Sequence, residues 1–140
     1  MRPHQATCVQ IGGRGLLIEG PPGSGKSSLA LALIDRGGEL VGDDSLMLEL
    51  RDARLIAHPH PETRGLLEVR NLGLLDFPTC PAAPIALMLR LDPDAPRWIE
   101  APEWLDLLGM RLPLVRLWPE SPLQHLKAEH ALARYGLVFD

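Results

Sequence analysis

The order of apolar and polar positions predicts two β-hairpins in the first half of the chain. Residues 5–11 alternate loosely between polar and apolar side chains, the glycine-rich segment 12–15 follows, and residues 16–18 form an apolar run. This order is typical of two antiparallel strands joined by a tight turn. The segments 46–51 and 54–58 flank a second short turn signal, Asp-Ala, and predict a second hairpin.

Apolar residues recur at helical spacing in two places. The first stretch predicts a helix over residues 27–36, which the glycines of segment 37–38 end. The second predicts a C-terminal helix with Ser121 as its N-cap, Pro122 as its first residue and Gly136 as its stop.

Further short apolar runs predict elements between and after these helices and hairpins. Residues 39–42 form a short strand, and residues 66–70 form a short apolar element that carries one acid and one base. Residues 85–91 are nearly continuously apolar, which predicts a central strand buried on both faces, with a structural rather than a chemical role. Residues 112–117 predict another strand, which Pro113 places near a sheet edge.

The segment 98–109 allows two interpretations. It contains Trp98 and Trp104, and it is either a short helix or a loop that packs both tryptophans. The elements together predict an α/β fold, a mixed β-sheet with flanking helices. At 140 residues the chain is expected to form one domain, residues 1–140.

Composition excludes several classes of protein. A hydrophobic content of 46% and a charged content of 23% are ordinary for a globular protein, and the net charge of -4 argues against a general nucleic-acid binder. No apolar run approaches the length of about 18 residues that a membrane span needs, and no signal region follows Met1, so we expect a cytoplasmic protein without a membrane partner. Cys8 and Cys80 are expected to be reduced thiols in or near the core.

One motif indicates a specific chemistry. Residues 20–27 satisfy the phosphate-loop (P-loop) pattern G-x-x-x-x-G-K-[ST] in full, between a predicted strand and a predicted helix. Backbone N–H groups of such a loop surround phosphate oxygens, Lys26 adds a positive charge, and Ser27 offers a hydroxyl to Mg²⁺. We therefore expect a nucleoside triphosphate with Mg²⁺ as the ligand. The expected nucleotide-binding residues are Gly20, Pro21, Pro22, Gly23, Ser24, Gly25, Lys26, Ser27 and Ser28.

Three carboxylates are candidates for chemistry beside this loop. Asp43 and Asp44 follow the strand that comes after the loop's helix, and strand ends beside a phosphate loop face the phosphates. If the strand geometry persists, the two side chains point to opposite sides; alternatively, they form a polar turn. Glu68 lies between apolar residues, so it either pairs with Arg70 or Arg64 or coordinates Mg²⁺.

Histidine and arginine side chains supply weaker candidates. His4 precedes the first predicted strand and could polarise a carboxylate or a substrate hydroxyl, although a terminal histidine is usually solvated. His58 and His60 have no third metal ligand nearby in the sequence and are interpreted as surface or loop residues. Arg111 and Arg116 could reach a phosphate or an acidic partner, but a solvated edge strand explains them equally well.

Several of these segments together resemble one family, the bacterial HPr kinase/phosphorylases, whose catalytic domain shares its P-loop fold with ATP-type phosphoenolpyruvate carboxykinases. The resemblance begins at His4, runs through the phosphate loop and residues 29–37, and reaches Asp43 and Asp44. It resumes over residues 66–76, where Leu-Glu-Val-Arg-Asn-Leu-Gly is similar to the family signature Leu-Glu-(Ile/Val)-Arg-Gly-(Leu/Met)-Gly. Many unrelated enzymes have a phosphate loop, so this second segment makes the resemblance specific.

The resemblance implies a role for each matching residue. Asp43 would be the base that takes the proton from a seryl hydroxyl of the phosphocarrier protein HPr, and His4 would support that carboxylate. Lys26 would hold the β- and γ-phosphates. Ser27 and Glu68 would contribute to the Mg²⁺ shell with the help of Asp44. In the reverse direction, the family uses inorganic phosphate to dephosphorylate seryl-phosphorylated HPr and releases pyrophosphate.

The chain also departs from the family pattern. Only three residues precede His4, so we expect the short form that is typical of alphaproteobacteria and lacks the N-terminal domain. Asn71 replaces the usual glycine, and residues 112–116 lack the Gly-Arg-Asn part of the family's Pro-Val-Arg-Pro-Gly-Arg-Asn. Kinase activity is therefore expected more firmly than phosphorylase activity. The family's hexamer makes a homo-oligomer a further expectation.

The leading hypothesis is an ATP- and Mg²⁺-dependent protein-serine kinase that acts on HPr or an HPr-like phosphocarrier and regulates a phosphotransferase system. One alternative is a P-loop kinase that acts on a small molecule. Another is a nucleotide-sensing module without catalysis, because the C-terminal motif is incomplete.

Overall fold

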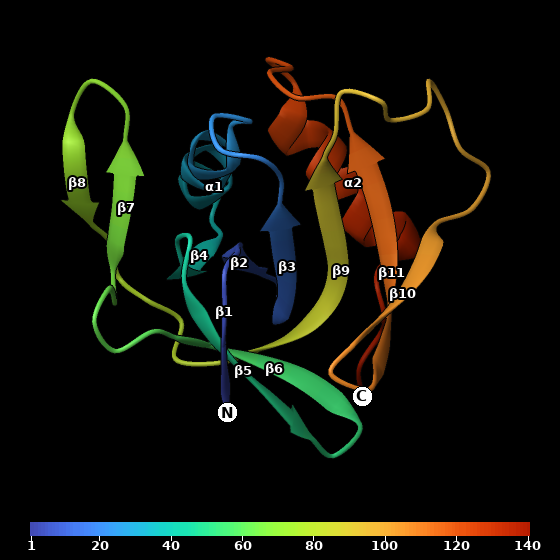
Figure 1. The fold of residues 1–140 in the computed structure, drawn as a ribbon, viewed down its shortest axis with the longest axis horizontal. Helices are drawn as coiled ribbons and strands as arrows, with labels where there is room; N and C mark the ends of the chain where they lie inside the picture. Colours follow the sequence, from blue (N-terminus) through green and yellow to red (C-terminus); the bar gives the residue numbers. More distant parts are fainter.

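The sheet is built around β9 (Ala83–Leu91) in the computed structural model, which describes residues 1–140 (Figure 1). This strand pairs in parallel with β3 (Arg14–Glu19) on one side and with β11 (Met110–Leu117) on the other. Its first two residues also pair antiparallel with β6 (Arg54–Pro59). The central, fully covered strand that the apolar run predicts is therefore confirmed, and the sheet is mixed as expected.

Both predicted hairpins form. β2 (Thr7–Ile11) pairs antiparallel with β3, and β5 (Leu46–Arg51) pairs antiparallel with β6. The short strand β4 (Glu39–Gly42) adds to β2 at one edge, and β1 (Arg2–His4) adds to β5 at the other. The sheet order along this path is β1-β5-β6-β9-β3-β2-β4, and it curls so that β5 and β6 cross below the parallel strands (Figure 1).

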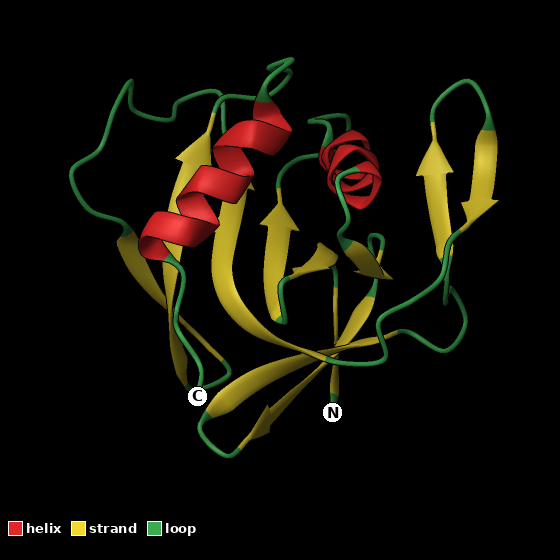
Figure 2. Ribbon diagram, turned by 180° about the vertical axis from the view of Figure 1, so that it is seen from behind, coloured by secondary structure: helices red, strands yellow, loops and turns green.

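Two helices cover one face of the parallel strands. Figure 2 shows α1 (Lys26–Asp35) and α2 (Gln124–Tyr135) next to each other in front of the sheet. The prediction for α1 is confirmed to within one residue at each end. The glycine stop is confirmed as well, because the Gly37 and Gly38 N–H groups bond the carbonyls of the last turn.

The start of α2 differs from the prediction. Ser121 does not cap the helix, which begins three residues later with Leu123 as its N-cap. The Ser121 carbonyl and hydroxyl instead accept hydrogen bonds within a turn, from the N–H groups of Gln124 at 3.2 Å and Leu123 at 3.2 Å. The Gln124 side chain fixes this turn by donating to the Trp118 carbonyl at 2.7 Å.

Hydrophobic side chains pack on both faces of the parallel strands. On the helical face, Leu16, Ile18, Leu87 and Leu89 pack against α1 and α2. On the other face, Leu17 and Met88 join the residues of β5 and β6. The alternation of Leu16, Leu17 and Ile18 between the faces follows from the two-residue period of a strand. Burial on both sides fixes the position of the strand ends that carry the site.

Two segments form structure that the sequence pattern did not reveal. Residues 103–107, within the stretch interpreted as a helix or a tryptophan-packing loop, form β10 (Glu103–Leu107), which pairs with β11. That interpretation was wrong, and Trp98 and Trp104 are 71% and 46% exposed. β10 occupies the edge and β11 lies next to it, so the position near a sheet edge that Pro113 indicated is confirmed.

The signature-like segment forms a separate hairpin. β7 (Leu66–Val69) and β8 (Gly73–Asp76) pair only with each other, and Figure 1 shows them standing beyond α1. Leu67 is fully buried in the helical-face core, which anchors β7 to the body of the protein. Glu68, its neighbour in the strand, is exposed on the opposite face.

Two remaining expectations, on the cysteines and on membrane spans, have outcomes in the structure. Cys8 and Cys80 are buried and free, as predicted. Burial raises the pKa of the Cys8 thiol far above its ordinary value, with a smaller contribution from Cys80. Neither helix is long and apolar enough to span a lipid bilayer.

Candidate active site

A polar cavity of about 1010 Å³ lies beside the phosphate loop. It extends between the C-terminal ends of β3 and β9, the end of β4 and the outlying strand β7. All nine residues expected to bind nucleotide, residues 20–28, line it together with Asp43, Asp44 and Glu68. Leu91 is its only hydrophobic aliphatic residue. A cavity with this lining suits a charged, water-soluble ligand.

The loop has the geometry that phosphate binding requires. Gly25 adopts a φ of 101°, which side-chain-bearing residues rarely reach, and it is the N-cap of α1. A Cβ on Gly20 would lie 2.6 Å from the Ser24 hydroxyl, so a larger residue would push into the loop. The first turn of α1 has no side-chain cap and no acidic residue, which leaves its N–H groups and its positive dipole end available to an anion.

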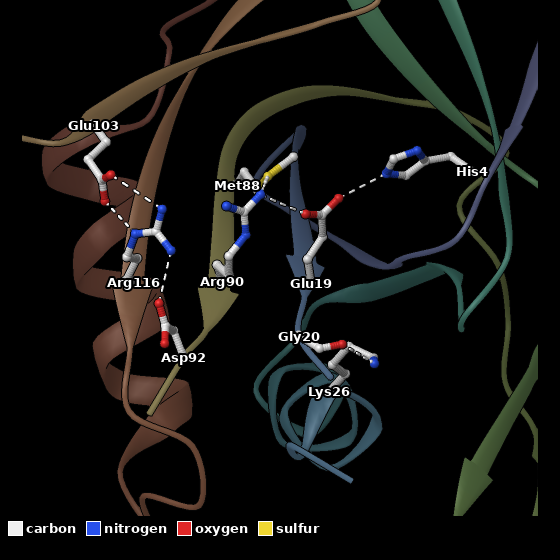
Figure 3. Close-up of polar contacts among 9 residues, drawn as sticks. All are labelled: His4, Glu19, Gly20, Lys26, Met88, Arg90, Asp92, Glu103 and Arg116. Carbon is white, nitrogen blue, oxygen red and sulfur yellow. Dashed lines mark hydrogen bonds and ion pairs between the residues drawn. The ribbon is translucent and has the colours of Figure 1, made fainter. Parts of the chain in front are cut away.

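Two polar side chains of the loop are consistent with an anionic ligand. The Ser24 hydroxyl is buried without a hydrogen-bond partner, an arrangement that calls for an explanation in a native structure. The Lys26 ammonium lines the cavity and donates to the loop's own Gly20 carbonyl at 2.7 Å. Figure 3 shows this contact at the start of α1. The donors present therefore fit a polyphosphate.

Asp43 is the best-connected carboxylate of the cavity. Its Oδ1 accepts hydrogen bonds from the Ser27 hydroxyl at 2.8 Å and from the Thr7 hydroxyl at 3.0 Å. Its Oδ2 accepts from the Ser27 hydroxyl at 3.0 Å and from the Glu68 N–H at 3.1 Å. These donors come from α1, β2 and β7, so three separate elements place the carboxylate against the phosphate loop. Sequence reasoning missed Thr7, which is fully buried.

Asp44 and Glu68 complete an oxygen-rich wall. The strand geometry does not persist past Gly42, because Asp44 has a φ of 60°, and both adjacent carboxylates therefore line the same cavity instead of facing apart. Glu68 makes no ion pair with Arg64 or Arg70, so the pairing alternative is not observed.

These oxygens have the chemistry that Mg²⁺ prefers. The Ser27 hydroxyl and the carboxylates of Asp44 and Glu68 are hard oxygen donors. No group of three or more His, Cys, Asp or Glu side chains in the structure forms a metal site by itself. Magnesium beside a phosphate loop usually keeps few protein ligands and takes the rest from phosphates and water, so this donor set fits that pattern.

His4 lies against a different carboxylate from the one expected. Its Nε2 is 3.0 Å from Glu19 Oε2, and it makes no hydrogen bond with Asp43 (Figure 3). The other oxygen of Glu19 accepts from Arg90 Nη2 at 3.1 Å. The hydrogen bond from His4 is the largest cause that lowers the pKa of Glu19; burial opposes it and Arg90 adds to it. Glu19 thus joins His4 on β1 to Arg90 on β9.

The strand predicted over residues 85–91 as a structural element also contributes a charged side chain to the cavity. The strand is apolar as far as Leu89, but Arg90 at its C-terminal end lines the cavity. The available signal was a charged residue at the end of a central strand, the place where parallel strands carry functional side chains.

A second charged cluster lies farther along the same edge. Arg116 binds Glu103 and Asp92, with Nε to Glu103 Oε2 at 2.7 Å and Nη1 to Asp92 Oδ2 at 2.9 Å (Figure 3). The pKa of Asp92 is lowered first by the N–H of Asp94 and then by Arg116. Arg111 instead stacks on the ring of Trp104 at 4.9 Å and does not line the cavity.

Comparisons with known proteins agree with this geometry. The family model described as HPr Serine kinase C-terminal domain matches residues 2–81. The HPr kinase/phosphorylase of Clostridium tetani is 45% identical over 71 residues, which are 51% of this chain and 23% of that protein. The corresponding protein of Clostridium beijerinckii is 46% identical over 71 residues, 51% of this chain and 24% of that protein. The matched segment thus spans only about a quarter of these curated relatives.

The structural comparison extends the similarity beyond residue 81. A solved structure titled as the Hpr(Ser) kinase/phosphatase from Coxiella burnetii superposes with a TM-score of 0.83 and 27% identity. The alignment covers 95% of this chain and 98% of that chain. The second half, where the sequence resemblance is faint, therefore has the same fold as that protein.

Proposed function

This chain belongs to the family of HPr serine kinase C-terminal domains, and on that premise we propose that it is an ATP- and Mg²⁺-dependent protein-serine kinase. Its substrate is a serine of HPr or an HPr-like phosphocarrier in the cytoplasm, and the reaction regulates a phosphotransferase system. The observation that carries the proposal is the position of Asp43, a carboxylate held against Ser27 of the phosphate loop inside the polar cavity.

The residues of the cavity divide the work of phosphoryl transfer. The loop amides and Lys26 bind the phosphates of ATP, and Ser27, Asp44 and Glu68 would hold Mg²⁺. The metal ion, when bound, neutralises charge on the phosphates. The seryl oxygen of the carrier bonds to the γ-phosphorus, and the bond from that phosphorus to the leaving ADP breaks. Asp43 accepts the proton that the seryl hydroxyl loses in this step. Thr7 and the Glu68 N–H hold Asp43 in place for this step.

The support for Asp43 as the base is geometric. Its hydrogen-bond donors are hydroxyl and backbone N–H groups, and no arginine or lysine pairs with it. Ser27 is the last residue of the loop and donates to Asp43, so a hydroxyl that approaches a bound phosphate also approaches this carboxylate. Positioning and charge stabilisation account for most of the catalysis in reactions of this kind.

The proposal is tested by incubating the purified chain with an HPr-type phosphocarrier, ATP and Mg²⁺, and locating phosphate on the carrier by mass spectrometry. We expect one phosphoserine on the carrier, formed in a single turnover. Phosphate on a small metabolite instead would support the small-molecule kinase. ATP binding without any transfer would support the nucleotide-sensing module.

The reverse reaction is tested with the phosphorylated carrier. Inorganic phosphate is added, and pyrophosphate is measured. Release of pyrophosphate would extend the proposal to phosphorylase activity, and its absence would restrict the chain to the kinase direction.

A further inference from the structure

Three charged side chains lie side by side across the strand ends next to the phosphate loop. Glu19 on β3 is the register partner of Arg90 on β9, and Arg90 is in turn the partner of Arg116 on β11. Register partners on neighbouring strands point to the same face of a sheet. Figure 3 shows this row, with Arg90 between Glu19 and Arg116.

The two arginines of this row differ in what their guanidinium groups contact. Arg116 uses all three nitrogens: Nε and Nη2 donate to Glu103, and Nη1 donates to Asp92. Arg90 uses only Nη2, which donates to Glu19 and weakly to the sulfur of Met88 at 3.8 Å. Its Nε and Nη1 have no partner in the protein, and the side chain is 34% exposed. Two guanidinium nitrogens of Arg90 therefore have no partner, whereas each guanidinium nitrogen of Arg116 already has one.

The free N–H donors of Arg90 lie beside the phosphate-loop cavity. Arg90 lines the phosphate-loop cavity and Arg116 does not. The side chains that line this cavity are rich in acids, which repel a polyphosphate, so each cation there matters for binding. The acidic ones are Glu19, Asp43, Asp44, Glu68, Asp92 and Asp94, and the basic ones are Lys26, Arg70 and Arg90.

We propose that Arg90 binds the terminal phosphoryl group of ATP and that Glu19 is the positioning residue that aims it. This inference rests on the proposed function, because it assigns a further residue to the same site. A planar guanidinium with unused N–H groups suits phosphoryl oxygens, and it favours a charge-rich terminal phosphate over the inner ones. Lys26, at the start of α1, belongs to the loop that holds the phosphate chain as a whole.

Glu19 is suited to positioning because its two oxygens have separate tasks. Oε1 accepts from Arg90, and Oε2 bonds His4, so the carboxylate is fixed from both sides. Fixing Glu19 in turn limits the positions that Arg90 can occupy. Pre-orientation of this kind lowers the entropy that the arginine loses when it binds a ligand.

The test compares the affinities of the chain for Mg-ATP and Mg-ADP by calorimetry. Arg90→Met should weaken ATP binding by about tenfold or more and leave ADP binding within about twofold, because ADP lacks the group that Arg90 contacts. Arg111→Met, at an arginine that stacks on Trp104 outside the cavity, is the control and should change neither affinity. Equal weakening of both nucleotides by Arg90→Met, or no change in either, would overturn the proposal.

The role of Glu19 is tested by non-additivity. Glu19→Gln alone should weaken ATP binding less than Arg90→Met does, and it should weaken it no further in the Arg90→Met background. Additive losses would show that Glu19 acts independently of Arg90 and would overturn the positioning role. If Arg90→Met fails to fold, Arg90→Lys replaces it. That variant keeps the positive charge but loses the planar set of guanidinium N–H donors, so ATP binding should again be weakened more than ADP binding.

The two proposals can fail separately. The binding assays need no phosphoryl acceptor, so selective weakening of ATP by Arg90→Met would stand even if the chain phosphorylates no carrier. If the chain phosphorylates the carrier while Arg90→Met binds ATP normally, only the role of Arg90 fails. A wild-type chain that binds neither nucleotide would overturn both.

Discussion

Two carboxylates beside the phosphate loop, Asp43 and Glu19, are held in opposite ways. Asp43 receives its hydrogen bonds from hydroxyl groups and a backbone N–H. Glu19 receives its hydrogen bonds from His4 and from the guanidinium of Arg90, and its pKa is lowered mainly by the bond from His4. Both residues line the same cavity at strand ends, so their difference comes from their partners and not from depth.

This difference assigns them different work. A carboxylate that is held by neutral donors keeps its charge available for a proton or a cation, which suits a base. A carboxylate that is already bonded to an arginine and a histidine serves better as a support that orients its partners. In the proposed kinase, Asp43 on the β4 side is the reactive acid and Glu19 on the β3 side is the supporting acid.

The largest effect is expected from removing the charge of the reactive acid. Asp43→Asn should lower phosphoryl transfer to the carrier by about 10²–10⁴-fold, because a general base contributes on that order, while ATP affinity stays near normal. The measurement is transfer of labelled phosphate under single-turnover conditions. Asp106→Asn, an exposed strand substitution outside the cavity, is the matched control and should transfer normally. Normal phosphoryl transfer by the Asp43→Asn variant would contradict the assignment of Asp43 as the base.

The next effect concerns the loop that both carboxylates border. Lys26→Ala should weaken ATP and ADP binding together by about tenfold or more, because the lost ammonium contacts the phosphate chain rather than the terminal group alone. Calorimetry with ATP and with ADP measures both affinities for the wild type and the variant. Unchanged affinities would contradict the phosphate-loop interpretation, and selective weakening of ATP would move the role proposed for Arg90 to Lys26.

A smaller effect tests how Asp43 is held. Thr7→Val keeps the shape of the buried side chain but removes the hydroxyl that donates to Asp43 and accepts from the Asp44 N–H at 3.3 Å. The free energy of unfolding should fall by about 1–3 kcal/mol, because buried polar groups lose a partner. Urea denaturation measures it, and Thr79→Val, which removes only a long contact to Arg64 at 3.4 Å, serves as the control. Equal stability of the Thr7 variant and the wild type would show that Thr7 is not needed to hold Asp43.

The smallest effect is a pH dependence of stability that comes from Glu19. The pKa of Glu19 in the folded protein lies below its ordinary value of 4.5. Its charge therefore stabilises the fold above about pH 4.5, and this contribution is lost as the pH falls through the lowered folded value. The melting temperatures of wild type and Glu19→Gln should differ most near neutral pH and converge in acid. A constant difference across the range would exclude this contribution.

Local patterns predicted the elements whose hydrogen bonds are close in sequence. The two hairpins and helix α1 follow from alternation, turn residues and 3.6-residue spacing, and the structure confirms them. β10 was missed because Trp104 interrupts the alternation of Leu105, Asp106 and Leu107, and only pairing with β11 makes the segment a strand. The β7–β8 hairpin was missed for a similar reason, since Leu67 is anchored by α1 and not by neighbours in sequence.

The sequence by itself determined the phosphate loop, the helix behind it and the acids expected to work with it, because a loop of this kind is encoded within eight consecutive residues. Only the tertiary structure decided how Asp43 is held and that Glu19 belongs to the same cavity. Thr7 reaches Asp43, and His4 and Arg90 reach Glu19, across strands that are far apart in the chain. Strand register sets which side chains meet at a sheet edge, and register depends on packing of the whole sheet.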